Sequence, residues 1–160
     1  MGHSNISIFV PHLGCPHQCS FCNQKHITGC AYLPHAKDID DAVNIAVSSK
    51  NFSSVDAEIA FFGGSFTAIE PAYMHELLFC ASKYVKKHTV SGIRISTRPD
   101  CINAEILETL KEYGVTSIEL GAQSMIDDVL IANNRGHKSA DVVFASRMIK
   151  DFGFSLGLQM

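Results

Sequence analysis

The chain has 160 residues, of which 46% are hydrophobic and 18% are charged, and its formal net charge is −3. This length and composition suit one domain with a buried core and exclude a disordered chain. The charge gives no general attraction to nucleic acid or to an acidic membrane, although a separate domain could supply a basic surface for an RNA substrate.

Short apolar runs, typical of strands, alternate along the chain with longer segments of helical periodicity. We expect strands at residues 6–11, 57–64, 92–97, 115–121 and 154–160. The alternation predicts a parallel α/β sheet with right-handed crossovers, which is either an open doubly wound sheet or part of a barrel.

Helices are expected between these strands, at residues 39–49, 71–87, 103–114 and 139–153. Pro71 suits a first turn, whereas Asn103 and Ser139 suit N-caps and Gly153 suits a helix stop. The fifth strand begins just before the chain stops. We therefore interpret residues 1–160 as the first part of a longer protein, with a complete five-stranded sheet as the alternative.

Unusual polar residues and glycines follow the predicted strands at their carboxyl ends, where parallel α/β folds bind ligands. Three cysteines follow the first strand, two glycines the second, and polar side chains the third and fourth. The opposite loops resemble ordinary solvated turns. This one-sided placement favours a site at the carboxyl ends of the strands, although strand ends are often polar.

The first loop contains the pattern C-x₃-C-x₂-C, formed by Cys15, Cys19 and Cys22. Three thiolates suit a 4Fe–4S cluster that keeps one iron open for a small ligand.

The chain lacks a secretion signal and an apolar run that spans a bilayer, so we expect a cytoplasmic protein with reduced thiols and no membrane contact.

Zinc is the rival metal, because His12, His17 or His26 could supply a fourth ligand. A zinc-binding interaction module is therefore the alternative class of function. A second pair of cysteines at metal-site spacing is missing, and Cys80 is expected to pack in the core.

The cysteine motif, with Phe21 before its last cysteine, and the segment FFGGSFT resemble the motifs of the radical S-adenosylmethionine (SAM) superfamily. The resemblance covers nearly the whole chain. It implies a partial TIM-like barrel of six βα units, of which this chain would hold the first five strands in a single domain.

The resemblance implies that Cys15, Cys19 and Cys22 bind a 4Fe–4S cluster and that SAM chelates the fourth iron. Reduction of the cluster would cleave SAM to methionine and a 5′-deoxyadenosyl radical, which abstracts hydrogen from the substrate. The implied enzyme is oxygen-sensitive and takes its electron from a donor such as flavodoxin or ferredoxin.

The same resemblance implies positions that contact SAM. Phe21 matches a position beside the adenine, and Gly63 and Gly64 would let the backbone approach the methionine amino group. Ser65 stands where family members often have an acid. Three further positions match SAM contacts, namely Ser96, Gln123 and Arg135, the last of which would meet the SAM carboxylate.

The segments STRPD, IELGAQS and NNRGHK resemble two branches of the superfamily. One is the radical SAM core of the Elongator catalytic subunit, which implies tRNA wobble-uridine modification. The other is anaerobic coproporphyrinogen dehydrogenase, which implies a porphyrin precursor as substrate. The barrel core resembles both branches, so the two substrate classes stay open at this point.

Overall fold

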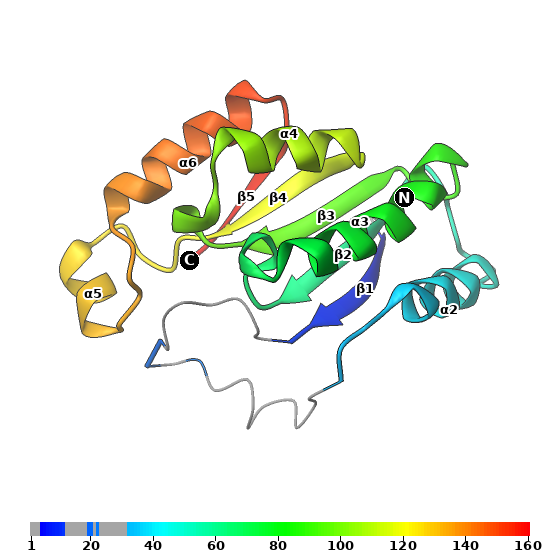
Figure 1. Cartoon of the computed structure of the whole chain (residues 1–160), viewed down its shortest axis with the longest axis horizontal. Helices are drawn as coiled ribbons and strands as arrows, with labels where there is room; N and C mark the ends of the chain where they lie inside the picture. Colours follow the sequence, from blue (N-terminus) through cyan, green and yellow to red (C-terminus); the bar gives the residue numbers. More distant parts are fainter. Residues whose placement is uncertain (1–3, 12–18, 21, 23–31) are drawn as a thin grey trace.

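The computed structural model describes residues 4–11, 19–20, 22 and 32–160. Its strands form one parallel sheet in the order β1-β2-β3-β4-β5 (Figure 1). Because the order follows the chain without reversal, the sheet is of the barrel type and not the doubly wound type, whose order reverses at a switch point. The strands are β1 (Ser4–Val10), β2 (Ala57–Gly63), β3 (Gly92–Thr97), β4 (Val115–Gly121) and β5 (Ser155–Gln159).

The helices that connect the strands cover one face of this sheet, as α3, α4 and α6 show in Figure 1. Right-handed crossovers that always advance in the same direction require this placement. The other face of the sheet is called the inner face below. The helices are α2 (Ala36–Val47), α3 (Pro71–Lys86), α4 (Ala104–Glu112), α5 (Asp127–Ala132) and α6 (Ser139–Asp151), with short 3₁₀ turns η1 (Phe66–Ala68) and η2 (Pro99–Cys101).

The hydrophobic core lies between the sheet and the helices. In β2, Ile59 and Phe61 face the helices and are fully buried, whereas Phe62 on the inner face is 42% exposed. Phe61 stacks on Phe66 of η1 with ring centroids 4.7 Å apart. Full burial of a side chain of this size stabilises the fold by about 1.5 to 3 kcal/mol. Cys80 is also buried in this core, as predicted.

The helix boundaries mostly follow the expected capping residues. Asn103 caps α4 by accepting a hydrogen bond from the backbone N–H of Ile106 at 2.8 Å. The expected cap of α6 is wrong by one residue, because Lys138 is the N-cap and Ser139 is already helical. The Asp141 carboxylate accepts from the Lys138 N–H at 2.7 Å, so a side chain inside the helix closes this end.

Two other expectations differ from the structure. Helix α2 begins at Ala36, three residues before the expected start, and α5 was not expected at all.

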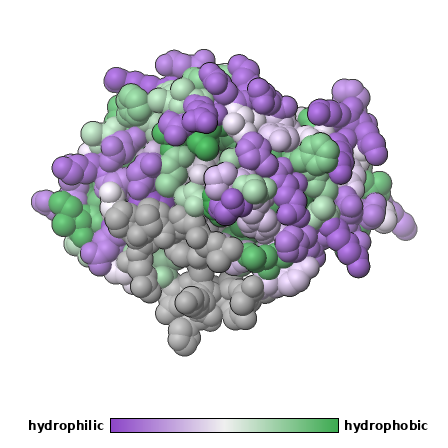
Figure 2. Space-filling model, in the orientation of Figure 1, coloured by the Kyte–Doolittle hydropathy of each residue, from purple (hydrophilic) through white to green (hydrophobic). Residues whose placement is uncertain are grey.

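Figure 2 shows that hydrophilic residues predominate on the face seen in Figure 1. Within the described part of the chain, every helix is too short or too polar to span a membrane.

Candidate functional site

The carboxyl ends of the parallel strands meet along one edge of the sheet, which we call the carboxyl edge (Figure 1). The N–H of Gly64, just after β2, donates to the carbonyl of Val10 at the end of β1, at 3.0 Å. Gly63 has φ +117°, and an added Cβ there would lie 2.5 Å from the Val10 oxygen. Glycine at position 63 therefore permits close contact between β2 and the start of the cysteine loop.

Two of the three motif cysteines, Cys19 and Cys22, belong to the described residues. The N–H of Cys22 donates to the carbonyl of Cys19 at 3.1 Å, which forms a turn that brings the two residues together. Ser20 anchors this turn to the end of α5, because its hydroxyl donates to the Asn133 side-chain oxygen at 2.6 Å. Cys15 and Phe21 lie outside the residues that the structure describes, as do the three candidate histidines of the zinc alternative.

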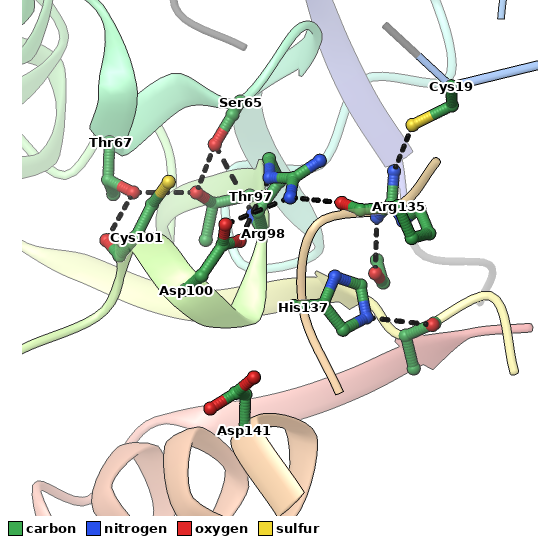
Figure 3. Close-up of polar contacts among 12 residues, drawn as sticks. Cys19, Ser65, Thr67, Thr97, Arg98, Asp100, Cys101, Arg135, His137 and Asp141 are labelled. Atoms are coloured by element: carbon green, nitrogen blue, oxygen red, sulfur yellow. Dashed lines mark hydrogen bonds and ion pairs between the residues drawn. The ribbon is translucent and has the colours of Figure 1, made fainter. Parts of the chain in front are cut away.

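Arg135 lies directly beside the first cysteine of this turn (Figure 3). Its Nη1 donates to the Cys19 sulfur at 3.3 Å, and its Nη2 donates to the carbonyl of Gly121 at the end of β4, at 2.6 Å. Gly121 makes room for this contact, since an added Cβ would lie 3.0 Å from Nη2. The guanidinium is buried and permanently charged, so it can offset the negative charge of thiolate ligands.

Arg98 holds the backbone of Arg135 in place. Its guanidinium forms a bidentate ion pair with Asp100, with both N–O distances 2.9 Å, and Nη2 also donates to the Arg135 carbonyl (Figure 3). Burial would raise the pKa of Asp100, but the hydrogen bonds and charge of Arg98 outweigh burial, so this pKa lies below its usual value. The pair therefore stays ionised at neutral pH.

A cluster of buried hydroxyls joins the segments that follow β2 and β3. The Thr97 hydroxyl lies 2.9 Å from that of Ser65 and 2.6 Å from that of Thr67, which also donates to the carbonyl of Cys101. Ser65 is buried within this cluster. The position that often carries an acid in the superfamily thus serves here to pack two loops together.

Gln123 and Arg135 line one pocket of about 290 Å³ at the carboxyl edge. Gln123 has φ +63°, and its N–H donates to the carbonyl of Gln159 at 2.8 Å, which joins the segment after β4 to the end of β5. The other lining residues come mainly from α5 and the segments beside it, and they are Ser124, Val129, Leu130, Asn133 and Met160.

Arg135 therefore lies beside two other candidate residues: it donates a hydrogen bond to the Cys19 sulfur, and it lines the pocket together with Gln123. Ser96 lies on the inner face of β3 instead, where its hydroxyl donates to Glu119 at 3.3 Å. Its partner on β4 is thus a carboxylate, and Ser96 does not line the pocket of Gln123 and Arg135.

His137 is a buried residue of this region that the sequence did not single out. Its Nε2 lies 3.2 Å from the carbonyl of Ala122, and burial lowers its pKa below the usual value of 6.5. The neutral imidazole therefore donates to this carbonyl at neutral pH. The sequence feature that could have identified His137 is its position in the segment NNRGHK, two residues after Arg135.

The donor set around Cys19 fits a thiolate-ligated metal group. Two cysteines share one turn, a buried guanidinium faces the sulfur of one of them, and Nε of Arg135 has no hydrogen-bond partner among the described residues. In the same part of the chain, no three His, Cys, Asp or Glu side chains group closely enough to hold a metal. The third motif cysteine, Cys15, lies beyond that part.

A model of the Radical SAM superfamily matches residues 9–159 of the chain. The chain is 20% identical over 185 residues to a tRNA uridine(34) acetyltransferase of Dehalococcoides mccartyi, covering 97% of this chain and 40% of that protein. It is 26% identical over 148 residues to the heme chaperone HemW of Bacillus subtilis, covering 88% of this chain and 38% of that protein. The chain thus spans about two fifths of the length of these relatives.

The fold resembles that of a solved structure of the archaeal Elp3 of Methanocaldococcus infernus. The TM-score is 0.66 at 19% sequence identity, over 99% of this chain and 38% of that chain. At this level of identity the likeness concerns the fold, and it agrees with a sheet of the barrel type.

Proposed function

Because the chain belongs to the radical SAM superfamily, we propose that Cys15, Cys19 and Cys22 bind a 4Fe–4S cluster and that this cluster cleaves SAM. Proteins of this superfamily use both cofactors. The observation that supports the proposal here is the hydrogen bond from the Arg135 guanidinium to the Cys19 sulfur, in a turn that also contains Cys22. When bound and reduced, the cluster supplies the electron that releases a 5′-deoxyadenosyl radical for hydrogen abstraction.

The residues of this chain then have distinct tasks. The three cysteines would hold the cluster, and SAM would bind through its amino and carboxylate groups. Arg135 offsets the negative charge of the cluster ligands, and together with Gln123 it offers polar groups in the 290 Å³ pocket for SAM.

Four other residues complete the proposed SAM site. Gly63 and Gly64, which lack side chains, are proposed to let the backbone after β2 approach the SAM amino group, and Ser96 to offer a hydroxyl from β3. Phe21 is proposed to lie beside the adenine. We propose further that residues 1–160 form the first five strands of a six-unit barrel, and that the enzyme works in the reducing cytoplasm with flavodoxin or ferredoxin as electron donor.

The proposed substrate is a uridine of tRNA. This proposal is supported by the relative that acts on uridine 34 of tRNA, as its name states. A porphyrin precursor of heme synthesis is the second candidate, because heme, which the name of the Bacillus subtilis relative contains, is itself a porphyrin. The chain spans about two fifths of both relatives, so each of these substrates is carried over from a longer protein.

Anaerobic reconstitution tests the proposed reaction. The protein, loaded with iron and sulfide and reduced with dithionite, should convert SAM to 5′-deoxyadenosine, which chromatography with mass detection measures. Replacing Arg135 with lysine should lower the yield, because the forked contacts with Cys19 and Gly121 are lost. A colourless protein that binds zinc and leaves SAM intact would instead support the interaction module.

A further inference from the structure

Five residues, one from each strand, lie at one level across the inner face of the sheet. Phe9 pairs with Phe62, Ser96 pairs with Glu119, and Glu119 pairs with Gly157 in the strand registers. Phe61 pairs with Ile95, so the residues that follow them, Phe62 and Ser96, also lie side by side. We call this set the inner row, and it consists of Phe9, Phe62, Ser96, Glu119 and Gly157.

The β1–β2 end of the inner row is aromatic and accessible. The rings of Phe9 and Phe62 pack edge to face, with centroids 5.5 Å apart, and Phe62 is 42% exposed. Gly63 allows this arrangement, since an added Cβ would lie 2.7 Å from the Phe9 ring. An exposed aromatic ring on a rigid strand is a surface on which a flat ring can stack.

The β4 end of the inner row is a carboxylate. Glu119 is 42% exposed at its side chain, and it accepts from Arg94 at 3.1 Å and from Ser96 at 3.3 Å. Arg94 also pairs with Glu58 at 2.9 Å, so one guanidinium is shared between two carboxylates. The group of three side chains therefore has a net charge of −1, and Glu119 is its exposed hydrogen-bond acceptor.

Glu58 is the buried partner, and its other contacts are already made. The hydroxyls of Thr116 and Ser117 donate to its Oε1 at 2.6 and 3.0 Å. Burial alone would raise the pKa of Glu58, but these hydroxyls and Arg94 hold it below its usual value. The network is thus anchored by the buried Glu58, while the carboxylate of Glu119 in the inner row remains accessible.

We propose that the inner row is the substrate subsite and that it takes a flat, uncharged heterocycle with an N–H edge, such as the uracil base of an RNA nucleotide. The proposal rests on the proposed function and selects between its two substrates. Phe62 and Glu119 are separated by two strand spacings, roughly 10 Å. Ser96, which is also proposed to contact SAM, is the residue at which this subsite would adjoin the SAM site. The small side chains of Ser96 and Gly157 leave space for a ring stacked on Phe62 to direct an N–H toward the Glu119 carboxylate.

Charge argues against a porphyrin precursor at this place. Such a molecule carries several carboxylates, whereas the inner face carries the net negative group of Glu58, Arg94 and Glu119. Arg94 is the only basic residue within the five strands, and both carboxylates already engage it. A uracil base brings no charge to the inner face, because the phosphates of the nucleotide are attached to the ribose, beyond the glycosidic bond.

Saturation-transfer NMR on the metal-free chain tests the subsite without the cofactors. The probes are uridine, 3-methyluridine, which lacks the N3–H donor, and coproporphyrin III. Uridine should bind more tightly than 3-methyluridine, and Phe62→Ala should weaken uridine binding by about tenfold through the loss of stacking. Phe79→Ala is the matched control, because Phe79 on α3 is 55% exposed but lies on the other side of the sheet.

Glu119→Ala should remove the preference for uridine over 3-methyluridine, and Glu119→Met, which also lacks a hydrogen-bond acceptor of this kind, serves if the alanine variant does not fold. The proposal is overturned if uridine does not bind, if the preference persists without Glu119, or if coproporphyrin binds at Phe62 in preference to uridine. These results are independent of the cluster. Failure of iron loading in the wild type would overturn the proposed function while the NMR outcome still decides the subsite.

Discussion

Arg135 donates a hydrogen bond to the sulfur of Cys19, a residue 116 positions earlier in the chain, at 3.3 Å. Both side chains are buried, and the second Nη of Arg135 is fixed on the carbonyl of Gly121. The contact joins the cysteine turn to the segment between α5 and α6. It places a permanent positive charge where the sequence motif predicts an anionic metal group.

Arg98 should be essential for stability because it is the buried cation that holds both Asp100 and the Arg135 carbonyl. Arg98→Met leaves the Asp100 carboxylate without its partner, and we expect a loss of about 3 kcal/mol in the free energy of unfolding. Urea unfolding followed by circular dichroism measures the loss. Arg147→Met, at an exposed site on α6, is the control, and equal effects of the two variants would refute the role of Arg98.

Gly63 should tolerate alanine less well than Gly153, although both have a positive φ. Gly153 has φ +89° and no atom within 4 Å of an added Cβ, so alanine there costs only backbone strain, about 1 kcal/mol. Gly63 adds close contacts with Val10 and Phe9, so we expect a cost of about 3 kcal/mol or more. Thermal unfolding compares the two variants, and similar melting temperatures would contradict the packing described for β1 and β2.

His137 should make stability depend on pH in the mildly acidic range. Its pKa is below 6.5 in the folded protein, because burial disfavours the imidazolium. Above pH 6.5 both states are neutral, but below it the unfolded chain takes up a proton that the folded chain does not. The contribution of His137 is therefore complete above pH 6.5 and is lost as the pH falls toward its folded pKa.

His137→Gln should flatten this dependence, and urea midpoints at about pH 7.5 and about pH 5.5 measure it. The exposed His88 is the control position, where His88→Gln should leave the dependence as in the wild type. If the two variants lose stability equally over this range, the assigned role of His137 is wrong.

Much of the fold follows from the periodicity of the sequence. The bounds of β3 and β4 match the expected residues, and Asn103 caps α4 as its side chain predicts. Helix α5 was missed because six residues, several of them exposed and apolar, give no amphipathic pattern to detect. The cap of α6 was misplaced because Asp141 closes the helix from within its first turn, which a search for a residue before the helix overlooks.

Candidate site residues could be proposed from the sequence where a motif is local, and not where a contact is long-range. The cysteine spacing and the positions of Gln123 and Arg135 were visible in the sequence alone. The contact of Arg98 with the Arg135 carbonyl spans 37 residues, and no spacing rule connects these two positions. The burial of Ser65 against Thr97 likewise depends on how two loops pack after their strands end.

The most direct test of the account is Mössbauer spectroscopy of the chain reconstituted anaerobically with ⁵⁷Fe, recorded before and after addition of SAM. Three cysteine ligands predict a 4Fe–4S spectrum in which one iron in four changes on addition of SAM, because only that iron lacks a thiolate. Replacing Cys19 with alanine should abolish the spectrum. A wild-type protein without a 4Fe–4S signal, or a full cluster in the Cys19→Ala variant, would contradict the central claim.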